Sequence, residues 1–160
     1  MKKTTLQNKN CLITGATGSL GTTLAMEFGR NNCNLFLTSQ SDSKLISLQN
    51  TIMKKFDTIS VKTFASNLAN MSDIDNLINN VRQSYTKIDI LINCAGILPI
   101  KFIQDSSMDD FDECFNINIR APIFLTKEFV KDMVHQKWGR IINIASSGAY
   151  NGQDSKMYHA

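Results

Sequence analysis

Thr14-Gly15-Ala16-Thr17-Gly18-Ser19-Leu20-Gly21 is a glycine-rich stretch that follows the short apolar run Cys11-Leu12-Ile13. The apolar run is typical of the end of a buried strand, and the recurrence of Leu20, Leu24 and Phe28 every four residues indicates one face of a helix. A strand, a tight glycine turn and a helix together form the context of a dinucleotide-binding loop. Glycines let the backbone approach a ligand closely, and the N–H groups at the start of the helix favour a pyrophosphate. For the glycines taken alone, an ordinary turn between a strand and a helix is the alternative interpretation.

The bulk composition favours one soluble globular domain over residues 1–160. Hydrophobic residues make up 42% and charged residues 19% of the sequence, which is ordinary for this class. The net charge is +3 and the lysines are scattered, so nucleic acid is not expected as a partner. Lys2 and Lys3 are not followed by an apolar segment, and no apolar run approaches the roughly 18 residues of a membrane span. We therefore expect neither a signal peptide nor a membrane association.

The cysteines lie far apart in the sequence, at Cys11, Cys33, Cys94 and Cys114. They form no C-x-x-C pair and have no histidine close by, so neither a disulfide framework nor a metal site is expected. They are typical of small buried residues in a cytoplasmic protein.

Strand-like and helix-like segments alternate five times along the chain. Residues 88–93 are nearly all β-branched or leucine, as expected of a central strand that is covered on both faces. The alternation predicts a parallel sheet with helices on both faces, and right-handed crossovers around the glycine loop predict the doubly wound order 3-2-1-4-5. We expect an α/β fold of three layers, with the other strands at 11–13, 34–38, 59–65 and 140–145.

The helices carry their own signals. The polar loop Ser39–Ser43 can cap the second helix, and Ser72 is expected to cap the third. A long helical stretch follows over 108–135, with Pro122 expected to kink or restart it. The pattern places the following residues on the apolar side of that stretch: Phe111, Phe115, Ile119, Ile123 and Val130.

Polar or glycine residues follow every expected strand. They are Gly15–Gly21, Ser39 and Gln40, Asn67, Asn93–Gly96, and Ser146, in the order of the strands. Ligands of doubly wound sheets bind beyond the carboxyl ends of the strands, so five such groups together indicate a binding site at this edge.

These motifs carry a family resemblance. TGATGSLG at 14–21, NCAG at 93–96, Asn118 in FNINIRAP, and NIASS at 143–147 leading to Tyr158 make the chain resemble a short-chain dehydrogenase/reductase along essentially its whole length. The resemblance implies a Rossmann-like fold and hydride transfer between a nicotinamide and a carbonyl or alcohol.

The resemblance also implies roles for three residues. Tyr158 is the expected general acid/base, Ser146 is expected to hydrogen-bond the same substrate oxygen, and Asn118 is expected to hold a proton-relay water. A free tyrosine has a pKa near ~10, and the family lowers it with a lysine four residues further on. The present sequence ends at Ala160, two residues after the tyrosine, so we expect it to be the N-terminal part of a longer protein and inactive by itself.

The cofactor is expected to be NADP(H), with NAD not excluded. Ser39 and Gln40 stand where an aspartate would bind the ribose of NAD and repel a 2′-phosphate, and Lys44 lies one turn further on. Asn67 stands where the family often has an aspartate that contacts adenine. The full set expected to bind the cofactor is Gly15, Thr17, Gly18, Ser19, Leu20, Gly21, Ser39, Gln40, Asn67, Leu68, Asn93, Ala95 and Gly96.

Two classes of function follow. The first is an NAD(P)-dependent oxidoreductase whose small-molecule substrate is a sugar, an acyl thioester, a steroid or a small ketone. The second is a truncated, non-catalytic module that binds a nucleotide or a partner, because the lysine and the final strands of the family pattern are absent from the sequence. A sheet that ends at its fifth strand would leave an apolar flank, which favours association with a partner or with further copies of the chain.

Overall fold

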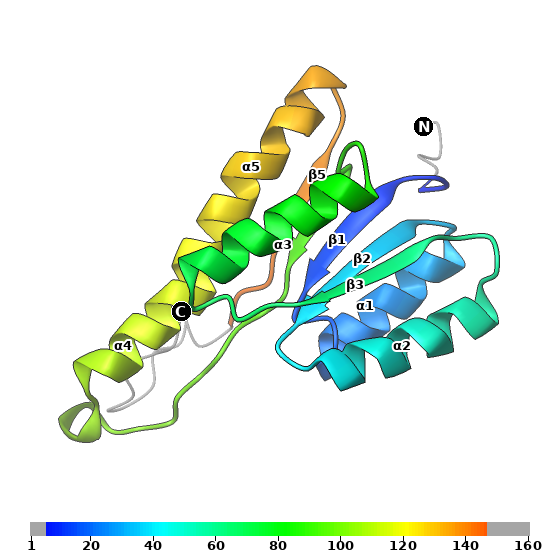
Figure 1. Ribbon diagram of the computed structural model, residues 1–160. Helices are drawn as coiled ribbons and strands as arrows, with labels where there is room; N and C mark the ends of the chain where they lie inside the picture. The colour runs from blue at the N-terminus through cyan, green and yellow to red at the C-terminus, as the bar shows by residue number, and fades with distance from the viewer. Residues whose placement is uncertain (1–5, 147–160) are drawn as a thin grey trace.

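The computed structural model describes residues 6–146, which form one parallel sheet with helices on both faces (Figure 1). The strand order is β3-β2-β1-β4-β5, and every neighbouring pair is parallel. This confirms the order 3-2-1-4-5 that the alternation predicts. The strands are β1 Asn10–Thr14, β2 Asn34–Ser39, β3 Val61–Ala65, β4 Ile90–Asn93 and β5 Arg140–Asn143, so β3, β4 and β5 are shorter than expected.

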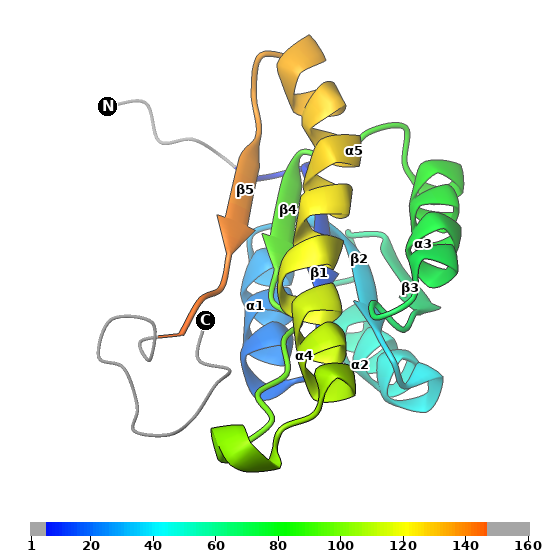
Figure 2. The same ribbon diagram turned by 90° about the vertical axis from the view of Figure 1, so that its left-hand side faces the viewer.

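Two hydrophobic clusters cover the two faces of the sheet. Alternate residues of β1 point to opposite sides, so Cys11 and Ile13 join one cluster while Leu12 joins the other. The first cluster packs under α1 and α2, and the second under α3 and α5. Figures 1 and 2 show these two pairs of helices on opposite faces of the sheet. The α-helices are α1 Ser19–Arg30, α2 Asp42–Lys55, α3 Met71–Ser84, α4 Met108–Phe115 and α5 Ala121–His135. None of the helices between residues 6 and 146 is long and apolar enough to cross a membrane.

The inner face of α1 differs from the expected one. Gly21, Ala25 and Gly29 are buried, whereas Leu20 is exposed. A Cβ at Gly21 would lie 2.2 Å from the carbonyl oxygen of Gly15, so only a small residue lets the helix lie this close to the turn before it. The four-residue spacing of Leu20, Leu24 and Phe28 correctly predicts a helix, but it does not predict which side of the helix packs on the sheet.

The start of α3 also departs from the expectation. The helix begins at Met71 with Asn70 as its N-cap, and no side chain caps it, so Ser72 is not the cap. The cap of α2 is confirmed, because Ser41 accepts a hydrogen bond from the backbone N–H of Lys44. Asn32, just after α1, adopts a positive φ of 59°, a conformation that asparagine tolerates better than most residues.

The long helical stretch is interrupted by a π-helical turn over Asn116–Arg120, between α4 and α5. Pro122 lies in the first turn of α5, where a proline ring is tolerated. The expected restart of the helix near Pro122 is therefore confirmed: α5 begins at Ala121, and one wide π-helical turn connects it to α4 without a break in the helical backbone.

The side of this stretch that packs on the sheet is not the one expected. Phe115 is 46% exposed and Ile123 is 58% exposed, and Phe111 and Ile119 are exposed as well, while Val130 is half-buried. The buried positions lie next to them in the sequence and are Cys114, Ile117, Ala121, Leu125, Phe129 and Met133. Two apolar sides are present, and spacing alone does not tell which of them meets the sheet.

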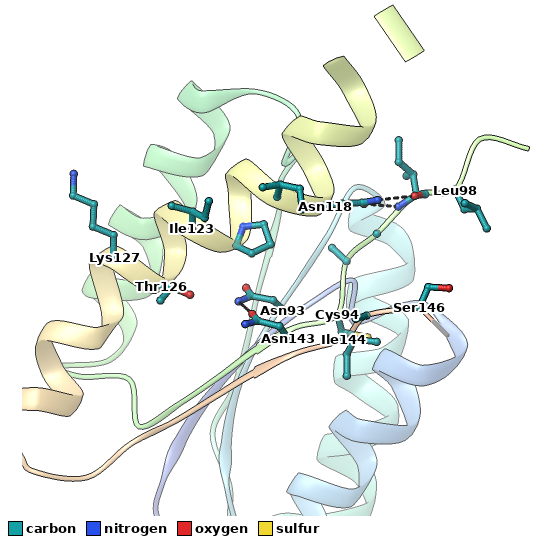
Figure 3. Close-up of a pocket in the computed structure, with 16 residues that line it drawn as sticks. Asn93, Cys94, Leu98, Asn118, Ile123, Thr126, Lys127, Asn143, Ile144 and Ser146 are labelled. Carbon is teal, nitrogen blue, oxygen red and sulfur yellow. Dashed lines mark hydrogen bonds between the residues drawn. The ribbon is translucent and has the colours of Figure 1, made fainter. Parts of the chain in front are cut away.

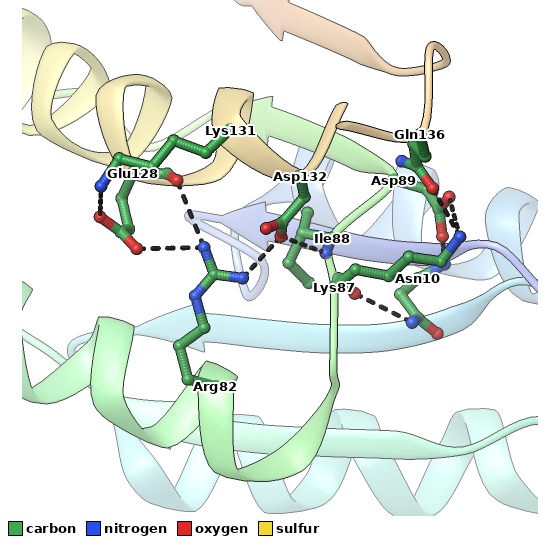
Figure 4. Close-up of polar contacts among 9 residues, drawn as sticks. All are labelled: Asn10, Arg82, Lys87, Ile88, Asp89, Glu128, Lys131, Asp132 and Gln136. Carbon is green, nitrogen blue, oxygen red and sulfur yellow. Dashed lines mark hydrogen bonds and ion pairs between the residues drawn. The ribbon is translucent and has the colours of Figure 1, made fainter. Parts of the chain in front are cut away.

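An ion-pair cluster joins α3 to α5 (Figure 4). Arg82 donates to Asp132 at 2.6 Å and to the Glu128 carboxylate at 3.0 Å. Asp132 also accepts from the backbone N–H of Ile88 at 2.9 Å, so the cluster reaches the chain that leads into β4. Lys131, and then Arg82, holds the pKa of Glu128 below its usual value. These bonds fix α5 along the sheet and thereby fix the residues at its N-terminal end.

Candidate functional site

The turns after β1 and β4 lie back to back at the carboxyl edge of the sheet. The Thr14 hydroxyl oxygen accepts from the backbone N–H groups of Cys94, at 3.1 Å, and Ala95, at 3.0 Å. Gly15 has a φ of +63°, and a Cβ there would lie 2.7 Å from the Cα of Ala95. A glycine is required at position 15 both by the backbone conformation and by the close approach.

The three glycines of the loop differ in how closely they are packed. Gly15 and Gly21 are packing positions, whereas a Cβ at Gly18 would meet only one atom, the Gly15 carbonyl oxygen at 3.4 Å. Gly18 is the N-cap of α1 and supplies no side-chain cap, and the first residues of the helix, Ser19 and Leu20, are exposed. The start of α1 is therefore exposed at Gly18, Ser19 and Leu20, as an anion-binding helix start requires.

A cavity of about 280 Å³ lies beside this loop, between the ends of β1, β2 and β3. Seven residues of its lining belong to the set expected to bind the cofactor: Gly15, Thr17, Ser39, Gln40, Leu68, Ala95 and Gly96. The rest of the lining is Ser41, Lys44, Ser66, Ile97 and Ile117. The Ser39 hydroxyl is buried and has no hydrogen-bond partner among the described residues. Asn67 lies next to the lining, and its side-chain oxygen accepts from Gln40 at 3.3 Å. A buried hydroxyl without a partner suits a site that a polar ligand completes.

Asn118 lies in the π-helical turn, and its side chain bonds to the backbone of Ile97. Its oxygen accepts from the Ile97 N–H at 2.9 Å, and its nitrogen donates to the Ile97 carbonyl at 2.9 Å. The nitrogen also lies 3.3 Å from the Cys114 sulfur. The side chain therefore holds the chain after Gly96 in place, and its expected role in holding a proton-relay water stays a prediction.

A larger cavity of about 710 Å³ opens between the ends of β4 and β5 and the helix α5 (Figure 3). Ser146 lines it together with Asn118 and Asn93–Gly96, so three expected groups meet here. The remaining lining is Ile97, Leu98, Ile119, Pro122, Ile123, Thr126, Lys127, Asn143, Ile144 and Ala145. Tyr158 lies outside the described residues.

Two amide side chains form the polar floor of this cavity. Asn93 donates to the side-chain oxygen of Asn143 at 2.8 Å (Figure 3). Asn93 is 3% exposed, and its own side-chain oxygen has no hydrogen-bond partner within residues 6–146. Asn143 was not among the expected site residues, although an asparagine in the otherwise apolar run Ile141-Ile142-Asn143-Ile144 is the signal that would have found it.

The cysteines are less uniformly buried than expected. Cys11, Cys33 and Cys114 are buried, but Cys94 is half-buried and lines the larger cavity. Partial burial raises the pKa of the Cys94 thiol above its usual value, so the group stays protonated at neutral pH. The cavity accordingly offers amides and a serine hydroxyl rather than a thiolate nucleophile.

Comparison with known proteins identifies the family. The model of the short chain dehydrogenase family matches residues 9–160. The 3-oxoacyl-[acyl-carrier-protein] reductase FabG of Rickettsia felis is 33% identical over 147 residues, which is 92% of this chain and 57% of that protein. The chain thus spans little more than half the length of this curated relative.

Solved structures agree on the fold. L-sorbose reductase from Gluconobacter frateurii, complexed with NADPH and L-sorbose, matches 96% of this chain and 58% of its own with a TM-score of 0.90 and 23% identity. NAD+-bound xylitol dehydrogenase matches the same shares with a TM-score of 0.85 and 24% identity. With the glycine loop, the Asn118 turn and the Ser146 cavity on one edge of the sheet, the match of the family model over residues 9–160 shows that the chain belongs to the short chain dehydrogenase family.

Proposed function

We propose that the protein is an NADP(H)-dependent oxidoreductase that transfers a hydride between the nicotinamide and a carbonyl or alcohol group. The observation that carries the proposal is the convergence of three parts on one edge of the sheet. These are the exposed start of α1 after Gly18, the cavity that reaches Ser39, and the cavity that joins Asn118 to Ser146.

The cofactor fits the residues that are present. The first-turn N–H groups after Gly18 would hold the pyrophosphate, and the adenosine would enter the smaller cavity. Neither Ser39 nor Gln40 at the end of β2 is acidic, and the next acidic side chain along the chain is Asp42, the first residue of α2. Ser39, Ser41 and Lys44 line the cavity and would bind that phosphate, and the unpartnered Ser39 hydroxyl supports this placement. Among the similar structures, the sorbose reductase holds NADPH and the xylitol dehydrogenase NAD+.

The chemistry divides between the cofactor and this chain. The nicotinamide supplies or accepts the hydride when it is bound. Ser146 would donate a hydrogen bond to the substrate oxygen, and Tyr158 would give that oxygen its proton during reduction and remove it during oxidation. Asn118 would act as a positioning residue, because its amide holds Ile97 and thereby the wall of the cavity. A tyrosine has an ordinary pKa near ~10, so this role requires a nearby positive charge.

A second candidate is a module that binds a nucleotide or a partner without catalysis. Phe111, Phe115, Ile119 and Ile123 favour it, because they leave an apolar stripe exposed along α4 and α5. Association of further copies along this stripe belongs to the same proposal. The four free thiols support a cytoplasmic location for either candidate.

Titration of the protein with NADPH and NADH, followed by nicotinamide fluorescence, tests the cofactor assignment. Lys44→Gln should weaken NADPH binding about tenfold, as expected for loss of one charge-assisted bond, and leave NADH binding unchanged. Lys54→Gln is the matched control, since it removes an equal charge from the far end of the same helix. Equal effects of the two substitutions would refute the phosphate assignment, and failure to bind either nucleotide would refute the cofactor proposal.

Turnover separates the two candidate functions. The assay is NADPH consumption at 340 nm with small ketones, sugars and acyl thioesters, measured on the full chain together with any residues that follow Ala160 in the natural protein. Ser146→Ala should lower kcat about a hundredfold, the range of a lost transition-state hydrogen bond, and leave the Kd for NADPH unchanged. Tight nucleotide binding with no turnover of any of these classes would favour the non-catalytic module.

A further inference from the structure

The thiol of Cys114 lies behind the wall of the larger cavity. Cys114 belongs to α4, is 6% exposed and is not among the residues that line the cavity. Asn118, four residues further along the same helical stretch, does line it, and so does Ile97. The thiol therefore acts on the cavity only through these two neighbours.

Polar contacts join the Cys114 sulfur, the Asn118 amide and the Ile97 carbonyl in a closed ring. The Asn118 nitrogen donates to the Ile97 carbonyl oxygen at 2.9 Å and to the Cys114 sulfur at 3.3 Å. The Cys114 sulfur lies 3.9 Å from the same carbonyl oxygen, a long contact for a thiol donor. Burial, and then Glu113, raises the pKa of the Cys114 thiol, so the group keeps its proton at neutral pH and both donates and accepts.

This ring sets the orientation of the Asn118 amide. The backbone N–H of Ile97 can only donate, so the amide oxygen must face it, as Figure 3 shows beside Leu98. The NH2 group then points to the Ile97 carbonyl and to the sulfur, which take one hydrogen each. Within residues 6–146 the NH2 group has no other acceptor. An apolar side chain at position 114 would therefore leave one of its hydrogens unpaired, which weakens this orientation.

We propose that Cys114 is a positioning residue, whose sulfur holds the Asn118 amide in the orientation that binds Ile97 and thereby fixes the wall of the larger cavity. The amide also abuts the turn after β4, because a Cβ at Gly96 would lie 3.4 Å from the Asn118 side-chain oxygen. The effect of Cys114 on turnover rests on the proposed function, whereas its effect on the amide does not.

The test compares two replacements of Cys114 that separate size from hydrogen bonding. Cys114→Ser keeps a side chain that donates and accepts, whereas Cys114→Val is close to cysteine in size but offers the amide no acceptor. If the thiol only fills space, valine should match the wild type and serine should be the worse replacement, because it buries a hydroxyl. A positioning role predicts the opposite order.

Hydrogen exchange of the Ile97 backbone N–H, followed by NMR on the full chain, is the readout. The N–H of Leu91, in the buried strand β4, reports unfolding of the whole domain and is the internal reference. Relative to Leu91, exchange at Ile97 should be about fivefold faster in Cys114→Val than in the wild type, as expected for one lost hydrogen bond. Cys114→Ser should stay within about twofold of the wild type. Cys114→Ala also lacks an acceptor and adds no bulk, so it should behave as Cys114→Val does and replaces it where valine does not fit.

Cys11→Val and Cys11→Ser are the matched controls, because Cys11 is a fully buried cysteine that packs in the cluster under α1 and α2. Neither should change the ratio of exchange at Ile97 to exchange at Leu91. A ratio in Cys114→Val and Cys114→Ala that stays at the wild-type value overturns the positioning role. Equal ratios in Cys114→Val and Cys114→Ser overturn it as well.

Turnover tests the link to the chemistry. The kcat for reduction with NADPH should be lower in Cys114→Val than in Cys114→Ser, while the Kd for NADPH is the same in both. Equal kcat values in the two variants overturn the link between Cys114 and the cavity wall. Absence of turnover in the wild type counts against the proposed function instead, and exchange at Ile97 then still decides the role of Cys114.

Discussion

Replacing Gly21 by alanine should destabilise the protein, although the same exchange inside an exposed helix is normally favourable. Alanine gains about 1 kcal/mol over glycine in a helix interior. A Cβ at Gly21 would lie 2.2 Å from the Gly15 carbonyl oxygen and 2.8 Å from the Cα of Ala16, both of them backbone atoms that cannot rotate away. Overpacking of this kind costs about 3 kcal/mol, at the upper end of the usual range. The net loss is about 2 kcal/mol, which corresponds to a fall in Tm of about 4–8 °C for a domain of this size.

Gly29→Ala in the same helix is the matched control. There a Cβ would lie 2.9 Å from Cδ2 of Phe56, which is a side-chain atom on a half-buried ring that can move. The gain in helix propensity is the same, so the free energy of unfolding should change by less than about 1 kcal/mol. Thermal unfolding followed by circular dichroism at 222 nm measures both variants. A Gly21→Ala protein as stable as the wild type would refute the idea that the loop and α1 touch through backbone atoms.

Three further outcomes follow from the contacts described above. Asn118→Ala should remove both hydrogen bonds to the Ile97 backbone and lower the free energy of unfolding by about 2 kcal/mol. The Ile97 amide should then lose its protection from hydrogen exchange, which NMR measures. Arg82→Met should lower the free energy of unfolding by about 1 kcal/mol, a small loss because the arginine is partly exposed. The difference in stability between wild type and variant should shrink in 0.5 M salt, and urea titrations measure it. The pKa of Asp110 is held at about 2 by Lys101 and by Ser107, so its stabilising effect is present above the unfolded value near 4 and is lost as the pH falls through about 2. Lys101→Met should raise the midpoint of the Asp110 carboxyl signal in an NMR titration, and an unchanged midpoint would contradict the assigned cause.

The sheet order and the glycine loop were predictable because each depends on local patterns. The mostly apolar segment 88–93 and the turn at Gly15 stand out in any window of a few residues, and the preference for right-handed crossovers then sets the strand order. The packing side of α4 and α5 was not predictable in this way. Phe115 and Cys114 are neighbours, and the larger and more apolar of the two is the exposed one. Only the position of the neighbouring strands decides between them.

In the candidate site, too, features that depend on the local sequence were predictable, and contacts between distant segments were not. Residues at the carboxyl end of a strand, such as Asn93 and Ser39, could be placed at this edge of the sheet from the sequence. The engagement of Asn118 with Ile97 could not, because it joins two turns that are 21 residues apart. The orientation of the Asn67 amide likewise depends on Gln40, which the chain brings to it from the end of another strand.

The π-helical turn at Asn116–Arg120 makes the length of the chain, and not only its composition, a determinant of the site. One residue of an α-helix corresponds to a rotation of about 100° about its axis. Deleting a single residue from this turn would therefore twist α4 by about that angle relative to α5, carrying Cys114 out of the core and the amide of Asn118 away from Ile97. Functional chains with this architecture should tolerate many substitutions in the turn and no change in its residue count.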